Sequence, residues 1–480
     1  QNCQVQLQIY KLLLNSGIYD EMMGKYGKKV AVIGGGAAGC FAAVNMKEMN
    51  PDLDVTVYEA GPKLLAKVAV TGGGRCNLTN SFAEVRSIES VYPRGFRLMK
   101  RLLREFSNTD VCDWFEGRGV RLVTQSDQCV FPKSQQSSEI IETLVAGMKA
   151  SSVNVAVSHR LTSVLDTDGD QPGRYRLSFD TGRGTEMQQT EIYADIVLIT
   201  TGGSPKKSGL SMLDSLGLEI IDPVPSLFSF NIGAPEALAE IRRGNESKSS
   251  LAEAGKGRGV QVALTGTRKR DAELSALMGI VTENVVTGLA GTKFRAEGPL
   301  LITDWGMSGP AVLKLSSYAA KYLAEQNYSA ELMVNWAGKI TVPELEAVLS
   351  RISSSAPQKM SANVGPDFLN NRLWTYLLHR AGIPADRRWA EIGSKGLNRI
   401  ISTLTSDIYP VVGRNKFKGE FVTCGGVSLA DIDPKTLESR QHPGLYFAGE
   451  VTDVDAVTGG FNLQAAWTMG WVAARAIAQS

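Results

Sequence analysis

A glycine-rich turn between two strand-like segments is the feature that most constrains the fold of this 480-residue chain. Residues 29–33 (KVAVI) form an apolar run typical of a buried strand, and residues 54–58 (DVTVY) form the next one. Between them, Gly34, Gly36 and Gly39 make a G-x-G-x-x-G turn that leads into a helical stretch. The pattern predicts the strand–helix–strand unit of a Rossmann-type α/β domain.

The three glycines and the acid that follows have separate roles in such a unit. The first glycine allows the tight turn, the second lets the backbone approach a pyrophosphate, and the third lets the helix pack on the strand. The helix N-terminus then offers free N–H groups and a positive dipole end to phosphate. Glu59 ends the second strand, where its carboxylate can accept hydrogen bonds from ribose hydroxyls. The acid favours an unphosphorylated ribose, and therefore FAD or NAD over NADP.

A second half-site lies near the other end of the chain. Residues 444–450 form an apolar strand that ends in Gly-Glu, and Asp453, Asp455, residues 458–460 and Asn462 follow before a last helix. An acid after such a strand can bind the ribitol of a flavin, and the helix N-terminus can stabilise negative charge on the reduced ring. NAD alone does not need this half-site, so the pair predicts FAD. The alternative is a buried strand and a capped helix that only pack the sheet.

A third glycine cluster, in residues 67–80 (KVAVTGGGRCNLTN), suits a loop that lies against a large planar or anionic ligand. Asn77 and Asn80 can donate and accept across a ring edge. Cys76, beside Arg75, has two interpretations, a low-pKa thiol or, as we favour, a small residue in a crowded loop. Cys76 and Asn77 are the catalytic candidates that the sequence offers by position, and because the chain has only three histidines, a Tyr or water is the alternative acid or base.

Composition bounds the other function classes. The length predicts two or three domains, and a net charge of +2 does not by itself require a nucleic-acid partner. No apolar run reaches the roughly 18 residues of a membrane span. The six cysteines contain no Cys-x-x-Cys pair and the three histidines no metal-ligand spacing, so neither a dithiol relay nor a metal is predicted. A reducing, cytoplasmic location fits.

The pattern of segments predicts an insertion. Residues 192–200 read as one buried strand, and after about residue 208 short strand-like runs at 228–232, 260–264, 300–302 and 330–334 indicate a β-domain. Helical character then follows. The predicted boundaries are 1–27 for an N-terminal extension, 28–207 with 418–480 for the FAD-binding domain, 208–340 with 405–417 for the β-domain, and 341–404 for a helical subdomain. Since Met22 and Met23 lie just before the first strand, we expect the natural start there.

Five motifs carry a resemblance to a known family. They are VAVIGGGAAG (30–39), TGGGRCNLTN (71–80), TGGSPK (201–206), DWGMSGPAVLKLS (304–316) and GLYFAGEVTDVDAVTGGFNLQAAWTMG (444–470). The chain resembles the HI0933-like flavoproteins, also called the aminoacetone oxidase family, from residue 28 to its end. The resemblance implies a two-segment Rossmann-type FAD domain with an inserted β-barrel-like domain and a small helical subdomain.

The resemblance also implies the residues that contact the cofactor. They are Gly34, Gly36, Ala37, Ala38, Gly39, Glu59, Ala60, Lys67, Gly73, Gly74, Arg75, Cys76, Asn77, Leu161, Thr201, Gly202, Gly449, Glu450, Gly460, Phe461, Asn462 and Leu463. The chain departs from the wider pattern at Glu450, where Asp is common. Asp453 or Asp455 is therefore an alternative ribitol contact.

Members of the family resemble amine oxidases, NAD(P)H-dependent reductases of steroid-like enones, and RNA uridine reductases. We therefore expect a bacterial FAD-dependent oxidoreductase that acts on a small molecule by hydride transfer at flavin N5, either as a reductase with NADH or NADPH as transient reductant or as an amine oxidase. The alternatives are an RNA uridine reductase, a non-enzymatic FAD-binding protein and an NAD-only dehydrogenase. Two interpretations remain open for Trp305, Met307 and Ser308. They line a pocket, or they belong to the core and a turn.

A basic helix face keeps the RNA alternative open. Residues 97–106 predict an amphipathic helix with Phe96, Met99, Leu103 and Phe106 on its apolar face. The candidate phosphate contacts are Arg94, Arg97, Lys100, Arg101 and Arg104, with further basic residues at 256–258 and 268–270. A solvated charged face is the alternative interpretation.

Overall fold

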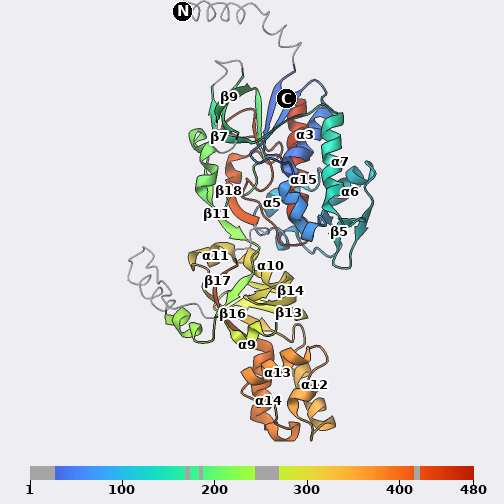
Figure 1. Cartoon of the computed structure of the whole chain (residues 1–480), viewed down its shortest axis with the longest axis vertical. Coiled ribbons are helices and arrows are strands. Elements are labelled where there is room, and N and C mark those ends of the chain that lie inside the picture. Colours follow the sequence, from blue (N-terminus) through green and yellow to red (C-terminus); the bar gives the residue numbers. More distant parts are fainter. Residues whose placement is uncertain (1–26, 168–172, 183–187, 244–269, 416–421) are drawn as a thin grey trace, which may run out of the picture. The chain divides into compact units, whose positions relative to one another are not determined.

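A computed structural model describes residues 27–167, 173–182, 188–243, 270–415 and 422–480 (Figure 1). The described residues form two compact units, one from residues up to 224 together with those from 422 onward, and one from the residues between 225 and 415. In the described part of the chain, none of the helices combines the length and the apolar character that a membrane crossing requires.

A parallel five-stranded sheet is the centre of the first unit. The strand order is β19–β10–β1–β2–β6, with every neighbouring pair parallel. The strands are β1 (Lys29–Ile33), β2 (Asp54–Glu59), β6 (Asn154–Val157), β10 (Ile196–Ile199) and β19 (Leu445–Phe447). The last part of the chain thus adds an edge strand to a sheet begun at its start, which confirms the Rossmann-type fold assembled from two segments.

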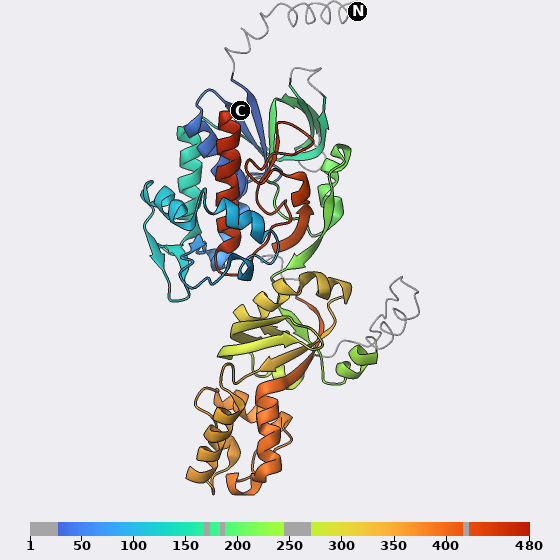
Figure 2. The same ribbon diagram turned by 180° about the vertical axis from the view of Figure 1, so that it is seen from behind.

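Three helices cover one face of this sheet, namely α3 (Ala37–Met49), α7 (Ser137–Ala150) and α15 (Phe461–Gln479), which lie side by side in Figures 1 and 2. Small residues let α15 approach α3 closely, since a Cβ on Gly470 would lie only 2.8 Å from Ala38 O. The rings of Phe41 and Trp467, both fully buried, are 5.3 Å apart at the same interface. The two helices from opposite ends of the sequence therefore share one core.

An antiparallel sheet of β7 (His159–Asp166), β8 (Tyr175–Thr181) and β9 (Gln188–Ala194) lies on the other side (Figure 1). The prediction of one strand over residues 192–200 is wrong, because β9 and β10 belong to different sheets. The chain passes between them at Asp195, whose carboxylate accepts a hydrogen bond from the Lys29 N–H at 2.8 Å.

Shorter elements complete the first unit. They are α4 (Ala66–Val70), β3 (Thr79–Asn80), α5 (Phe96–Leu102), α6 (Asn108–Glu116), β4 (Leu122–Thr124), β5 (Cys129–Pro132), β11 (Ile220–Ser226), β18 (Val422–Val427) and the 3-10 helices η1 (Thr71–Gly74), η2 (Ile88–Ser90), η4 (Lys207–Leu216) and η6 (Leu429–Asp431). β3, β5 and β4 form a small sheet, and β11 pairs with β18.

The second unit contains a closed barrel with strand order β12–β15–β14–β13–β16–β17, which confirms the β-barrel-like part of the predicted fold. Its strands are β12 (Phe230–Ile232), β13 (Val281–Leu289), β14 (Arg295–Thr303), β15 (Gly306–Ser308), β16 (Ala330–Asn335) and β17 (Asp407–Arg414), with helices α9 (Ala272–Ser275), α10 (Pro310–Tyr318) and α11 (Ala320–Glu325). Sequence reasoning missed β13, and the strand predicted at 260–264 lies outside the described residues.

A helical layer follows the barrel in the same unit. It consists of α12 (Val342–Ser355), η5 (Ser361–Asn363), α13 (Asn371–Arg380) and α14 (Trp389–Ser406). A buried polar cluster joins it to the barrel. The Asp407 carboxylate accepts hydrogen bonds from Arg380 Nη2 at 2.6 Å, Tyr409 Oη at 2.5 Å and Trp336 Nε1 at 3.2 Å. Burial raises the pKa of Asp407, and these donors oppose the rise.

Candidate functional site

The glycine turn lies at the carboxyl end of β1, and its first and third glycines are required by the packing of the protein itself. Gly34 has φ of +111°, and a Cβ there would lie 2.4 Å from Thr200 O. A Cβ on Gly39 would lie 2.0 Å from Gly34 O. Side chains at these two positions would clash with backbone, so the residues maintain the turn and the strand–helix contact.

Gly36 differs from its neighbours because it faces open space. A Cβ built there meets no described atom within 4 Å. Gly36 is also the N-cap of α3, and no side chain caps that helix end. Uncapped N–H groups facing open space at a helix N-terminus fit a phosphate group. The turn can therefore hold the diphosphate of a dinucleotide.

Glu59 ends β2 next to this turn. Its Oε2 accepts a hydrogen bond from the Gly35 N–H at 2.9 Å, and its Oε1 accepts one from the Gly61 N–H at 2.6 Å. The two backbone contacts fix the carboxylate at the carboxyl edge of the sheet. Each carboxylate oxygen has a further lone pair, so Glu59 can also accept from ribose hydroxyls, and exposed Ala60 lies beside it.

The third glycine cluster lies in η1, directly after α4, and forms an exposed loop. Gly72, Gly73 and Gly74 have φ of +57°, +69° and +84°, which glycine adopts readily. A Cβ on Gly73 would meet no described atom within 4 Å. Val70, at the start of the loop, is 56% exposed although it is apolar. A large flat ligand bound over this loop would fill the open space at Gly73 and cover the exposed side chain of Val70.

The two catalytic candidates follow this loop. Cys76 is fully buried, and burial raises the pKa of its thiol to about 12, which contradicts the low-pKa alternative and favours the small packing residue. The Asn77 amide, oriented to satisfy both of its groups, donates to Thr79 O at 3.0 Å and accepts from the Gly460 N–H at 3.1 Å. Asn77 thus ties the loop to the start of α15.

Glu450, the acid after β19, meets two other predicted cofactor residues. Its Oε2 lies 3.5 Å from Lys67 Nζ, and its Oε1 accepts from the Thr423 N–H at 2.8 Å. A Cβ on Gly202 would lie 3.5 Å from the same Lys67 nitrogen. The structure therefore brings Lys67, Gly202 and Glu450 together at the edge of the sheet. Sequence reasoning missed Thr423, whose backbone N–H and hydroxyl both donate to Glu450 Oε1, the hydroxyl at 3.4 Å, because no motif connects a lone threonine to an acid 27 residues away.

The alternative ribitol contacts are already engaged. Asp453 Oδ1 accepts from the Gly425 N–H at 2.9 Å. Asp455 is 1% exposed and is bound by two guanidinium nitrogens of Arg94. Glu450, whose side chain is 23% exposed, is therefore more accessible to a ribitol than Asp455. Arg94 correspondingly does not belong to an exposed basic face, and its assignment as a phosphate contact is wrong.

The start of α15 completes the group. Gly460, its N-cap, has φ of +90°, a Cβ there would lie 2.3 Å from Thr79 O, and no side chain caps the helix. The Asn462 side chain bonds both backbone groups of Ala456 at 2.9 Å. α15 therefore offers a second uncapped helix N-terminus.

The remaining predicted cofactor residues vary in exposure. At the start of α15, Phe461 is buried and Leu463 is half-buried. Gly449 directly precedes Glu450. Thr201, just after β10, is exposed. Leu161 is half-buried on β7 opposite Phe179, in the antiparallel sheet rather than at the carboxyl edge of the parallel one.

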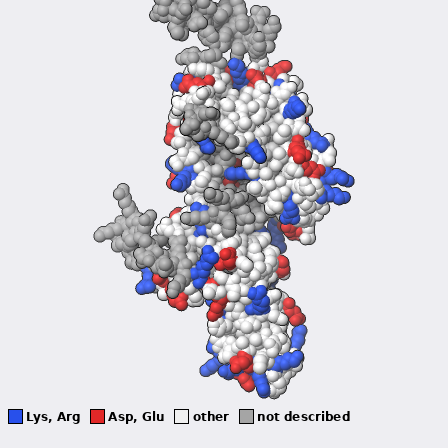
Figure 3. All heavy atoms as spheres, in the orientation of Figure 1, with Lys and Arg blue, Asp and Glu red and all other residues white. Residues whose placement is uncertain are grey.

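The basic face on α5 is exposed but smaller than predicted. Arg97, Lys100, Arg101 and Arg104 are exposed. The buried side chains of this segment are Leu98, Met99, Leu102 and Phe106, so Leu98 and Leu102 replace the predicted Phe96 and Leu103. In Figure 3 Lys and Arg alternate with Asp and Glu over the visible surface. Residues 256–258 and 268–269 lie outside the described part of the chain.

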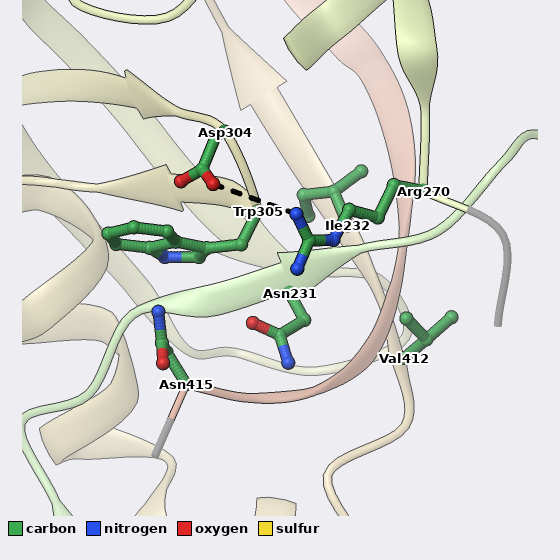
Figure 4. Close-up of a pocket in the computed structure, with 7 residues that line it drawn as sticks. All are labelled: Asn231, Ile232, Arg270, Asp304, Trp305, Val412 and Asn415. Atoms are coloured by element: carbon green, nitrogen blue, oxygen red, sulfur yellow. Dashed lines mark ion pairs between the residues drawn. The ribbon is translucent and has the colours of Figure 1, made fainter. Parts of the chain in front are cut away.

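In residues 305–309 (WGMSG), one predicted pocket residue lines a pocket and another lies in the core. Trp305 lines a pocket in the barrel unit, together with Arg270 (Figure 4). Met307 is fully buried in the core, and Ser308 Oγ lies 2.6 Å from Ser229 Oγ. No cluster of three or more His, Cys, Asp or Glu side chains suited to a metal ion occurs among the described residues.

Comparison with known proteins gives consistent matches over nearly the whole chain. The model of the HI0933-like protein Rossmann domain family matches residues 28–476. A 3-dehydro-bile acid delta(4,6)-reductase of Clostridium scindens is 26% identical over 469 residues, covering 94% of this chain and 99% of that protein. A ribosomal RNA dihydrouridine synthase of Haemophilus influenzae is 25% identical over 463 residues, covering 95% and 100%.

Among solved structures, a 3-ketosteroid-delta4-(5alpha)-dehydrogenase from Rhodococcus jostii covers 95% of this chain and 97% of its own. Its TM-score is 0.46 at 12% identity, too distant a likeness to carry an argument about function.

Proposed function

This chain belongs to the HI0933-like family and is an FAD-dependent oxidoreductase, and from that premise we propose that it reduces an electron-poor carbon–carbon double bond. The observation that carries the proposal is the pair of full-length relatives. One is named as a reductase of a bile acid with double bonds, and the other forms dihydrouridine, in which a double bond of uridine has been saturated. In both substrates the bond is conjugated with a carbonyl group.

The geometry fits the cofactor. We assign the FAD diphosphate to the open space at Gly36 and the N-terminus of α3, the adenosine ribose to Glu59, and the ribitol to Glu450 with Lys67. The exposed loop at Gly73 and the N-terminus of α15 would face the flavin ring. Bound FAD would supply two-electron redox chemistry by hydride transfer. The helix N-terminus would stabilise negative charge on the ring, and the loop would exclude water from it.

An anaerobic two-step experiment tests the proposed reaction. NADH or NADPH should bleach the visible absorption of the purified flavoprotein, and a steroid-type enone or a uridine-containing RNA should restore it. Bleaching by a small amine instead would support an amine oxidase. Flavin that neither nicotinamide cofactor reduces would contradict a reductase of this type.

Glu59→Ala should weaken FAD binding without unfolding the protein. Loss of charge-assisted hydrogen bonds to ribose should cost about 1.5–3 kcal/mol, or roughly ten- to a hundred-fold in Kd. Titration of the apoprotein with FAD measures the effect. Glu48→Ala is a matched control, because Glu48 is also in the first unit but pairs with Arg118. A Kd equal to wild type in Glu59→Ala would mean that Glu59 serves only the backbone of the turn.

RNA is the second candidate substrate, and the exposed basic group on α5 favours it. If Arg97 and Arg101 contact phosphates, Arg97→Glu with Arg101→Glu should reduce the slope of log K against log salt by about two. Filter binding of RNA at several salt concentrations measures this slope. The control is Arg387→Glu with Lys395→Glu, which makes the same charge change at exposed positions of the helical layer. If the two double variants reduce the slope equally, the effect comes from net charge, and the α5 surface is not an RNA-binding site.

A further inference from the structure

A row of buried hydrogen bonds runs along the first turns of α15, and we call it the Gln464 network. The Thr79 hydroxyl donates to Gln464 Oε1 at 2.5 Å. Gln464 Nε2 donates to Thr468 Oγ1, and the Thr468 hydroxyl donates to Phe106 O, both at 2.9 Å. Thr79, Gln464 and Thr468 are fully buried. Polar side chains so far from water have to bond one another.

The direction of the Gln464 network follows from which groups can donate. A backbone carbonyl only accepts, so the Thr468 hydroxyl must give its one proton to Phe106 O. Thr468 Oγ1 can then only accept from Gln464, which places the amide nitrogen on that side and the amide oxygen toward Thr79. Each bond therefore has one donor and one acceptor. A buried network that is satisfied in this way holds a single geometry.

Gln464 joins the network to the N-terminus of α15. Its backbone N–H donates to Gly460 O at 3.0 Å and closes the first turn of the helix. Gly460 in turn lies against Thr79, because a Cβ on Gly460 would be 2.3 Å from Thr79 O. Gln464 thus holds Gly460 through its main chain and Thr79 through its side chain. A shift of the helix start relative to β3 would break the bond between the two side chains.

Two more side chains hold the backbone on either side of Gly460. Asn80 Nδ2 donates to Gly459 O at 3.1 Å, and the Tyr92 hydroxyl donates to Phe461 O at 2.9 Å. Both bind carbonyl groups, and no described side chain caps the helix. The N-terminus of α15 is therefore held firmly while the N–H groups of its first turn stay available to a ligand.

We infer that Gln464 is a positioning residue that raises the reduction potential of the flavin by holding the N-terminus of α15 against β3. The inference rests on the position of the flavin ring in the proposed function. The positive end of a helix dipole stabilises negative charge, and this effect falls off within the first turn. Because reduction adds negative charge to the ring, a looser helix start should make reduction less favourable.

The midpoint potential of the flavin-loaded protein, measured against a reference dye, tests the inference without any substrate. Gln464→Met keeps the length of the side chain but removes both of its hydrogen bonds. We expect this variant to purify with stoichiometric FAD. The affinity for reduced FAD relative to oxidised FAD should fall about tenfold, which lowers the potential by about 30 mV for a two-electron couple.

Changes at Thr79 test the other end of the same bond. Thr79→Val removes the hydroxyl and should lower the potential in the same direction, whereas Thr79→Ser keeps the hydroxyl and should match wild type. Because Thr79→Val and Gln464→Met remove the same bond, the double variant should lower the potential no further than Gln464→Met alone. If Gln464→Met does not fold, the contrast between the two Thr79 variants decides, and equal potentials in both would overturn the inference.

Asn45→Leu is the matched control. Asn45 is a buried amide on α3 that likewise donates once, to Phe41 O, and accepts once, from Trp114 Nε1. Its loss should lower the urea midpoint as Gln464→Met does, but the flavin potential should stay at the wild-type value. If Asn45→Leu lowers the potential as much as Gln464→Met, the potential responds to any loss of stability, and the inference is wrong.

Leu463→Asp distinguishes failure of the inference from failure of the proposed flavin position. Leu463 lies half-buried in the first turn of α15, so an acid there should lower the potential of a nearby ring whatever Gln464 does. If only Leu463→Asp lowers the potential, the ring lies at this helix but Gln464 does not position it. If neither Leu463→Asp nor Gln464→Met changes the potential, both the flavin position and the inference are wrong.

Discussion

Gly36→Val is expected to give a folded protein that purifies without FAD. Gly36 has φ of −87°, which valine also adopts, and a Cβ there meets no described atom within 4 Å. The substitution therefore does not strain the protein, yet its side chain would occupy the space that a diphosphate needs against the turn. The ratio of flavin absorbance to protein absorbance measures the loss, and circular dichroism reports the fold.

Two other variants separate cofactor exclusion from misfolding. Gly39→Val should lose both FAD and the fold, because a Cβ there would lie 2.0 Å from Gly34 O. Gly36→Ala adds a single methyl group and should retain part of the FAD affinity. If purified Gly36→Val contains stoichiometric FAD, the diphosphate does not bind at this turn, and the assignment of the FAD site is wrong.

Asp407→Ala is expected to destabilise the barrel unit by about 3–5 kcal/mol, the usual cost of leaving one member of a buried ion pair without its partner. The Arg380 guanidinium, 2.6 Å from the carboxylate, would remain largely buried without a counter-charge. Tyr409 and Trp336 would each lose an acceptor as well. Since domains have only about 5–15 kcal/mol of stability, the midpoint of urea unfolding should fall markedly.

Two comparisons identify the cause of this effect. Glu297→Ala breaks an exposed pair with Lys339 in the same unit and should cost at most about 1 kcal/mol. Arg380→Met combined with Asp407→Leu removes both charges and should be more stable than Asp407→Ala. An Asp407→Ala protein as stable as Glu297→Ala would show that solvent reaches the cluster.

Much of the fold could be predicted because its signals are local. The turn at residues 34–39 and the acid at Glu59 lie within one strand–helix–strand unit, where periodicity and glycine positions determine the geometry. The run at 192–200 could not be divided correctly, because the last three residues of β9 and all of β10 are apolar and only Asp195 separates them. Which sheet each strand joins depends on distant partners, which periodicity does not report.

Site residues were harder to predict where the sequence pattern of a helix was continued past the end of the real helix. Arg94 shares a helical face with Arg97 and Arg101 only if the helix includes it. The helix begins at Phe96, after Gly95 at φ of +73°, so Arg94 points elsewhere and meets Asp455. That partner lies far along the chain, and no spacing rule connects the two. Side chains that converge from both ends of a sequence require the tertiary structure.

The two-segment sheet also has a consequence for synthesis of the protein. While the ribosome is still producing the last segment, β10 lacks its neighbour β19, and Phe41 of α3 lacks the cover of Trp467. Residues 225–415 are by then complete and can fold as a domain on the nascent chain. The dinucleotide domain, although it begins first, must finish last. Chaperones that shield exposed apolar surface should therefore bind nascent chains that end before residue 445 more strongly than the released protein.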